Sequence, residues 1–126
     1  MLIAQLVFEM EGFTVRSYKT FDFYQAPIEC AKHFASNGGL CTDYKYWLVC
    51  SDTEENDVIG QYRVLGGFQA KALFIACNDT VVIKDEDGFQ WIEAYDFPGV
   101  VFVRHNEMYF AFLDGYEVTA GELSGW

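Results

Sequence analysis

The sequence predicts an α+β fold: a mainly antiparallel β-sheet, built from hairpins and a C-terminal meander, with one short helix packed on it. Short runs rich in β-branched and aromatic residues recur along the chain, and Gly, Asn and Asp interrupt them at close spacing. A single segment carries apolar residues at a clear helical spacing. The 126 residues have the length of one compact domain, and 52% of them are apolar, which is enough for one core.

The chain is expected to begin with a hairpin and then a helix. Residues 2–9 and 13–19 are strand-like, and Gly12 in the link between them can adopt a positive φ. Residues 27–36 are predicted to be helical, because proline suits the first helical turn and Asn-Gly-Gly follows as a stop signal. The residues at helical spacing are Ile28, Ala31, Phe34 and Ala35.

Two strands and an ambiguous segment are expected next. Residues 44–50 and 58–65 are strand-like and are joined by a polar loop. Residues 70–77 form a short apolar run, which periodicity alone cannot assign to a strand or a helix. We favour a strand there, because Asn78-Asp79 has the composition of a turn into the next strand.

The last part of the chain is predicted to be a meander of four strands. In the final two strands neighbouring residues are both apolar, so part of this sheet should be covered on both faces. The helix could cover one region, and a second subunit in a homodimer could cover another. The four strands are expected at residues 80–84, 89–95, 100–105 and 108–113.

The sequence gives no indication of a membrane segment or an export signal. Its apolar runs are interrupted well before the roughly 18 residues that cross a bilayer. Residues 1–8 are apolar but lack a basic flank and a cleavage site, so they are interpreted as a strand. We therefore expect a cytoplasmic protein whose cysteines are free thiols, namely Cys30, Cys41, Cys50 and Cys77.

No motif predicts catalysis, a cofactor or a metal site. Cys30 and His33 are close enough to share a helix face, but the apolar pattern around Cys30 favours a buried thiol over a nucleophile. Adding Cys41 and Cys50 as zinc ligands gives spacings unlike those of structural zinc sites. The acidic turn before Gly88 does not fit a calcium-binding EF-hand loop. The chain is therefore expected not to be an enzyme.

The chain is strongly acidic, and most of the excess lies after residue 50. It has 19 acidic and 8 basic residues, a net charge of −11. Residues 1–50 hold five acids and four bases, a net of −1, whereas residues 51–126 hold fourteen acids and four bases, a net of −10. Such a charge repels nucleic-acid phosphates and anionic membranes and attracts a basic protein. A basic partner is therefore expected, and direct nucleic-acid or membrane binding is not.

Two acidic segments and the final tryptophan are the predicted partner-binding residues. The first segment spans roughly 20 Å if extended at about 3.3 Å per residue, so its charges resemble a diluted row of phosphates, which in one DNA strand are about 3.4 Å apart. Alternatively, both segments are solvated turns that keep an aromatic-rich protein soluble. The predicted residues are Asp52, Glu54, Glu55, Asp57, Asp85, Glu86, Asp87 and Trp126.

Aromatic side chains are the second predicted component of a binding surface. Exposed rings often anchor protein interfaces, and Trp126 follows a Ser-Gly pair, so it either docks back or contacts a partner. Most of the 23 aromatic residues are expected in the core; the rings considered for the surface are those of Tyr44, Tyr46, Trp47, Tyr109 and Trp126.

In charge and size alone, the chain resembles the small acidic proteins that phages use against restriction or CRISPR nucleases, and the immunity proteins of nuclease toxins. The resemblance implies a non-enzymatic inhibitor that covers the basic, nucleic-acid-binding face of a nuclease or another nucleic-acid-binding protein. One alternative is a carbohydrate- or small-ligand-binding β-domain that uses Trp47, Trp91 or Tyr109. Another is a small hydrolase with a carboxylate pair such as Glu93 and Asp96.

Overall fold

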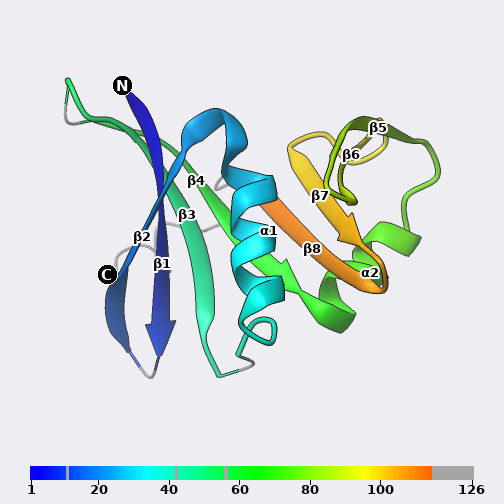
Figure 1. The fold of residues 1–126 in the computed structure, drawn as a ribbon, viewed down its shortest axis with the longest axis horizontal. Coiled ribbons are helices and arrows are strands. Elements are labelled where there is room, and N and C mark those ends of the chain that lie inside the picture. The colour runs from blue at the N-terminus through cyan, green and yellow to red at the C-terminus, as the bar shows by residue number, and fades with distance from the viewer. Residues whose placement is uncertain (11, 42, 56, 115–126) are drawn as a thin grey trace. The chain divides into compact units, whose positions relative to one another are not determined.

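The computed structural model has eight β-strands and two α-helices in the residues that it describes, which are 1–10, 12–41, 43–55 and 57–114, without the side chains of 14–18. The predicted α+β fold with a mainly antiparallel sheet is confirmed (Figure 1). Contacts group the chain into two compact units, and each combines segments that are not contiguous in sequence. The single domain stays a prediction.

The first unit is a four-stranded antiparallel sheet with the strand order β2-β1-β3-β4. The predicted first hairpin is confirmed: Gly12 in its turn has a φ of 86°, which L side chains rarely adopt. A 3-10 helix, Phe23–Gln25, follows the second strand. The four strands are β1 (Leu2–Met10), β2 (Phe13–Asp22), β3 (Lys45–Asp52) and β4 (Asp57–Gly66).

Strand β3, one of the two inner strands of this unit, is buried on both of its faces. Neighbouring side chains in a strand point to opposite faces of the sheet. Trp47 is 0% exposed and packs with Val7 and Val49 on one face, while Leu48 and Cys50 are each 2% exposed on the other. The core of the first unit therefore lies along β3.

The second unit combines both α-helices with a four-stranded antiparallel sheet in the order β8-β7-β6-β5. The predicted first helix is confirmed, with Pro27 in its first turn and Gly39 after its end, where the Gly39 amide donates to the Phe34 carbonyl at 2.8 Å. The elements are α1 (Ala26–Ser36), α2 (Gly67–Ile75), β5 (Thr80–Glu86), β6 (Phe89–Ala94), β7 (Val100–His105) and β8 (Met108–Asp114).

The predicted strand at residues 70–77 is wrong, because this segment lies mostly in α2, and the fold has a second helix. Ala70 is buried and Leu73 and Phe74 are half-buried, so the inward positions are three and four residues apart, as in a helix. The Cys77 thiol also donates to the Leu73 carbonyl oxygen at 3.4 Å, one turn back. Packing of this face against the rest of the unit therefore favours a helix in a segment whose sequence fitted both a helix and a strand.

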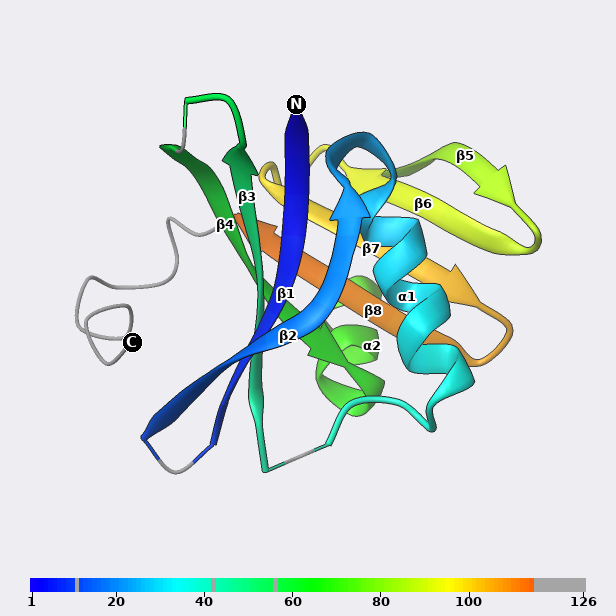
Figure 2. The ribbon, with the colours of Figure 1, turned by 60° about the vertical axis from the view of Figure 1, so that its left-hand side comes forward.

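The helices explain why the meander is apolar on both faces. Phe102 and Val103 are neighbours in β7, point to opposite faces, and are each 0% exposed. Phe74 of α2 contacts Phe102 with a centroid distance of 5.4 Å, whereas Phe34 of α1 stacks on Phe110 of β8. Figures 1 and 2 show the two helices on opposite sides of the β7–β8 pair. The unpredicted helix α2 thus covers one face of this strand pair, where the sequence analysis considered a second subunit.

A tight turn joins β5 to β6. Asp87 and Gly88 have φ values of 56° and 84°, as in the type I′ turns that suit the twist of two-residue hairpins. The Gly88 amide also donates to the Asp85 carboxylate at 3.0 Å. Glycine at the second position is thus required by the backbone.

We expect Gly88→Ala to lower the free energy of unfolding by about 1–2 kcal/mol, since alanine at this φ is strained. A Cβ atom would also lie 3.4 Å from the Nδ1 atom of His105. Urea unfolding followed by tryptophan fluorescence measures the change. The control is Gly60→Ala, whose Cβ meets Tyr62 at an ordinary 3.6 Å and whose effect should stay within about 0.5 kcal/mol. Equal effects of the two variants would contradict the turn assignment.

Candidate functional site

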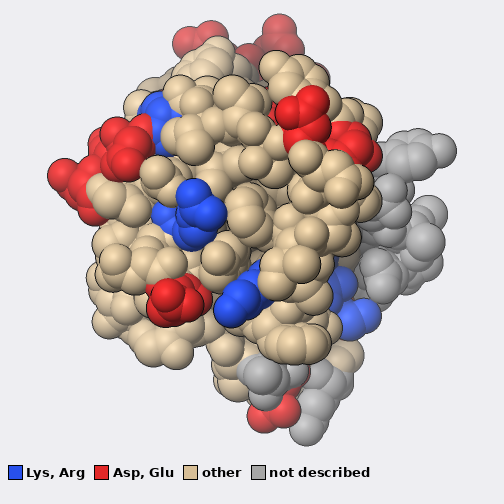
Figure 3. Space-filling model, turned by 90° about the vertical axis from the view of Figure 1, so that its right-hand side faces the viewer, with Lys and Arg blue, Asp and Glu red and all other residues tan. Residues whose placement is uncertain are grey.

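Acidic side chains form several separate groups on the face drawn in Figure 3, with lysine and arginine side chains between them. The two predicted acidic segments belong to different units of the chain: the loop after β3 to the first, and the β5–β6 turn to the second. Each segment is therefore a separate candidate site. Their union into one acidic field stays a prediction.

Asp52 shapes the loop of the first unit. Its Oδ1 atom accepts a hydrogen bond from the Glu54 amide at 3.0 Å and lies 3.3 Å from the amino group of Met1. The Glu54 amide, assisted by the amino group, holds the pKa of the Asp52 carboxyl below its usual value. Asp52 is thus engaged within the chain, and of the predicted binding residues in this loop it is the least available to a partner.

The other carboxylates of this loop face solvent. The Glu54 side chain is 83% exposed, with one oxygen 3.9 Å from the Met1 amino group. Glu55 and Asp57 are exposed, and no lysine or arginine among the described residues lies within ion-pair distance of them. Asp57 is also the register partner of Asp52, so two like charges face each other across the strand pair. A cation from a partner would relieve this repulsion.

The acidic turn of the second unit is held by contacts to α1. Asp87 accepts a hydrogen bond from the Lys32 ammonium at 3.1 Å, and this contact raises the pKa of Lys32. One oxygen of Glu86 is buried without a hydrogen-bond partner among the described residues. Asp85 accepts the bond from Gly88 described above. Only part of this predicted segment is therefore free to bind a cation.

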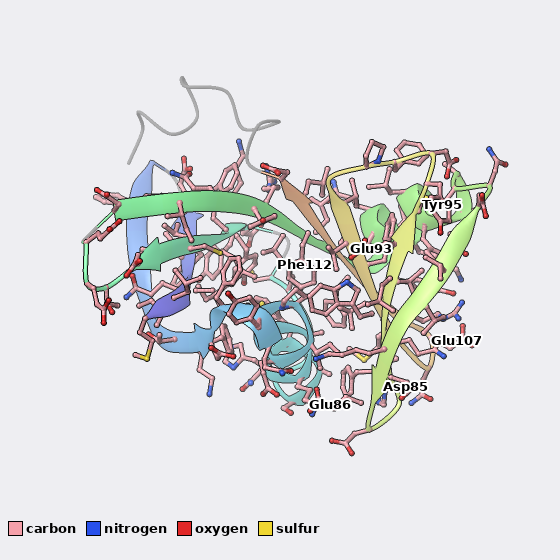
Figure 4. The ribbon with its side chains drawn as sticks, turned by 90° about the horizontal axis from the view of Figure 1, so that it is seen from above. Asp85, Glu86, Glu93, Tyr95, Glu107 and Phe112 are labelled. Atoms are coloured by element: carbon pink, nitrogen blue, oxygen red, sulfur yellow. The ribbon has the colours of Figure 1, made fainter. Side chains whose placement is uncertain are left out.

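Two acids that sequence reasoning did not include lie at the same end of the second unit. Glu29 of α1 has an oxygen 3.9 Å from the Lys32 ammonium, and Figure 4 shows Glu107 toward the same end of the sheet as Asp85 and Glu86. In an antiparallel meander the β5–β6 turn and the β7–β8 turn lie at the same end of the sheet. The predicted meander could therefore have placed Glu107, in the β7–β8 turn, near the acidic β5–β6 turn. The acidic residues at this end of the second unit are thus Glu29, Asp85, Glu86, Asp87 and Glu107, with Lys32 among them.

The basic residues after residue 50 lie over aromatic rings. A cation above a ring face is attracted by the ring's quadrupole. Arg104 also donates two hydrogen bonds to the Gln90 side-chain oxygen, at 3.1 and 2.8 Å. The cation-to-centroid distances are 5.1 Å for Arg63 on Trp47, 5.7 Å for Lys71 on Tyr109, 5.7 Å for Lys84 on Trp91 and 5.3 Å for Arg104 on Phe74.

The prediction of surface aromatics is wrong for two residues. Trp47 is 0% exposed and Tyr46 is 7% exposed, because β3 is an inner strand of the first unit and is covered on both faces. The Tyr46 hydroxyl accepts a hydrogen bond from the Cys41 amide at 3.1 Å. Tyr44 and Tyr109 are half-buried. Trp126 lies outside the described residues, so its role stays a prediction.

The structure shows the surroundings of the residues considered for catalysis. Cys30 is 0% exposed, and burial raises the pKa of its thiol far above the usual range, which opposes formation of a nucleophilic thiolate. Glu93 accepts a hydrogen bond from the Trp91 indole at 3.0 Å, while Asp96 accepts one from the Asn78 amide at 2.9 Å. These two carboxylates are therefore committed to different partners. Among the described residues, no group of three potential metal ligands comes together.

In the described part of the chain, no helix is long and apolar enough to cross a membrane. Comparison of the chain with protein-family models, curated proteins and solved structures finds no match to any of them.

Proposed function

We propose that this chain is a non-enzymatic binding protein whose exposed carboxylates engage the basic, nucleic-acid-binding face of another protein. The loop after β3 is the main contact, through Glu54, Glu55 and Asp57. Binding there blocks access of nucleic acid to the partner, which makes the chain an inhibitor. We place this interaction in the cytoplasm, because the four cysteines of this chain are free thiols, which persist in a reducing compartment.

One observation carries the proposal. The four basic residues that follow residue 50 lie over aromatic rings, whereas Glu55 and Asp57 have no lysine or arginine among the described residues within ion-pair distance. Part of the net charge of −11 is thus carried by the exposed carboxylates of Glu55 and Asp57, which no nearby lysine or arginine of the described residues neutralises. Complementary charge increases association rates and selects partners.

The carbohydrate-binding alternative has less support. A sugar site uses an exposed ring, but Trp47 is in the core, and the Trp91 indole is hydrogen-bonded to Glu93 and lies under the Lys84 ammonium. The hydrolase alternative requires two cooperating carboxylates, and Glu93 and Asp96 accept hydrogen bonds from different donors. A protein-binding role requires neither arrangement.

We expect the double variant Glu55→Lys/Asp57→Lys to bind a basic partner at least about tenfold more weakly, because it replaces attraction by repulsion at the loop. Partners captured from a lysate at about 50 mM NaCl, where charges act over more than 10 Å, are identified and purified. Affinity is then measured by calorimetry, and inhibition by the partner's binding to labelled DNA or RNA. These two positions leave the Asp52 contacts in place.

The matched control is Asp22→Lys/Asp43→Lys, which makes the same change in net charge at two exposed carboxylates of the same unit. It should weaken binding far less than the loop variant. Capture that is unchanged at about 500 mM salt, where the Debye length falls well below 10 Å, contradicts the proposal. So does a partner that still binds nucleic acid when saturated with the protein.

A further inference from the structure

Strand β5 is the last strand of the second unit's sheet, and no further strand of the described residues pairs with its outer edge. In an antiparallel pair, alternate residues direct their N–H and C=O groups away from the partner strand, so an edge strand presents unpaired main-chain groups. β5 runs from Thr80 to Glu86 and pairs with β6 on its inner side. In the described part of the chain, the strand order ends there.

The middle of this edge is apolar and exposed. Val81, Val82 and Ile83 are 38%, 46% and 51% exposed. Proteins usually protect an open edge with proline, several charges or a very short strand. β5 has seven residues and no proline, and its three charged residues, Lys84, Asp85 and Glu86, all lie at its C-terminal end, after the point where the pairing with β6 shifts. Residues 80–83 therefore carry neither proline nor charge. These are features of a strand that can accept another strand.

Negative charges flank the apolar segment on both sides. Asp79 precedes β5 and is exposed, while Asp85 follows the apolar residues and is also exposed; Asp87, in the turn after them, is ion-paired with Lys32. Figure 4 shows Asp85 and Glu86 at one end of the β5–β6 hairpin and Tyr95 at the other. The Tyr95 amide donates to the Asp79 carbonyl at 2.9 Å, so Asp79 lies beside Tyr95, which is 73% exposed. The edge is therefore apolar in the middle and acidic at its ends.

We propose that the β5 edge binds an extended segment of a partner protein, apolar in its middle and basic at both ends, as an added strand. Main-chain hydrogen bonds hold such a segment, and its side chains supply the specificity. Covering Val81 and Ile83 adds apolar burial, and the terminal cations face Asp79 and Asp85. The inference rests on the proposed function, because it takes the partner to be basic.

The charges argue against a second copy of this chain as the occupant. Antiparallel pairing of two β5 strands would bring Asp85 of one copy close to Asp79 of the other. Parallel pairing would place the acidic ends side by side. Each copy also carries a net charge of −11, so association of two copies is opposed by repulsion at long range as well.

The probe is the labelled peptide Lys-Lys-Val-Thr-Val-Thr-Val-Lys-Lys, titrated into the full chain and followed by fluorescence anisotropy and by amide NMR shifts. We expect binding, with the largest shifts along β5. Val81→Thr/Ile83→Thr should weaken binding about tenfold, because two apolar contacts are lost while both residues remain good strand formers. Circular dichroism shows whether the variant is folded.

The matched control is Phe68→Thr/Ile75→Thr on α2, which removes two apolar side chains that are 85% and 68% exposed elsewhere. It should leave binding unchanged. A peptide N-methylated at its five central residues, which cannot donate main-chain hydrogen bonds, and a peptide with glutamates in place of its lysines should both fail to bind.

Three results would overturn the inference: shifts confined to the loop after β3, equal binding of the N-methylated peptide, or light scattering that finds a dimer disrupted by Val81→Thr/Ile83→Thr. The first would leave the proposed function standing. Conversely, peptide binding at β5 that is unaffected by Glu55→Lys/Asp57→Lys, together with failure of that variant to weaken capture of a protein partner, would remove the loop as the main contact while retaining the edge.

Discussion

Phe102→Ala is expected to lower the free energy of unfolding by about 3–5 kcal/mol, the range found for large aromatic side chains removed from a core. Phe102 is 0% exposed in β7, and its ring meets Phe74 of α2 edge to face, with 5.4 Å between the centroids. Its removal leaves a cavity and takes from α2 a principal contact with the sheet. Urea unfolding followed by circular dichroism measures the loss.

Phe68→Ala is the control for this prediction. Phe68 belongs to α2 as well, but its side chain is 85% exposed, so its removal should change stability by no more than about 0.5 kcal/mol. A small effect of Phe102→Ala, or an equal effect of the two variants, would show that α2 does not pack on β7 through Phe102.

The thiols of Cys30 and Cys50 should react with iodoacetamide at least about a thousandfold more slowly than that of Cys41 in the folded protein, because they must wait for the chain to open. Cys30 and Cys50 are 0% and 2% exposed, whereas Cys41 is exposed. Burial also raises the pKa of Cys50 to about 11, which lowers the fraction of reactive thiolate. Mass spectrometry of the labelled peptides measures each rate.

Labelling in concentrated urea provides the reference for the thiols. There the three cysteines should react at similar rates, since burial no longer separates them. Cys77, which is half-buried, should lie between the two classes in the folded protein. Rapid labelling of Cys50 without urea would mean that β3 opens readily, contrary to its position as a buried inner strand of the first unit.

The elements whose ends are marked by glycine or proline in the sequence were predictable. Gly12 and the Asp87-Gly88 pair adopt the positive φ values that their turns require, and Pro27 and the glycines after Asn37 bound α1 as expected. α2 was not predicted, because a short apolar run fits both periods. The spacing of Ala70, Leu73 and Phe74 is compatible with a helix, but the sequence does not show that these residues face the sheet. The contacts of Phe74 with β7 and β8 show this in the structure.

The candidate site was only partly predictable. The sequence identifies the acidic segments, because neighbours in sequence share a loop. Lys32, however, contacts the β5–β6 turn from a helix more than fifty positions away, as the separation of 55 between Lys32 and Asp87 shows, and Glu29 lies beside Lys32. Likewise, a charge count treats Arg63 and Arg104 as available to neutralise carboxylates, whereas their positions over rings follow from strand register and helix packing.

The interleaving of the two units limits how the chain can be divided. The second unit takes α1 from one stretch of sequence and its sheet from another, and residues 41–64 of the first unit lie between those stretches. No single cut in the chain can therefore release either unit whole. Fragment expression should yield incomplete cores, and a proteolytic nick in the loop after β3 would leave two pieces that must remain associated to stay folded.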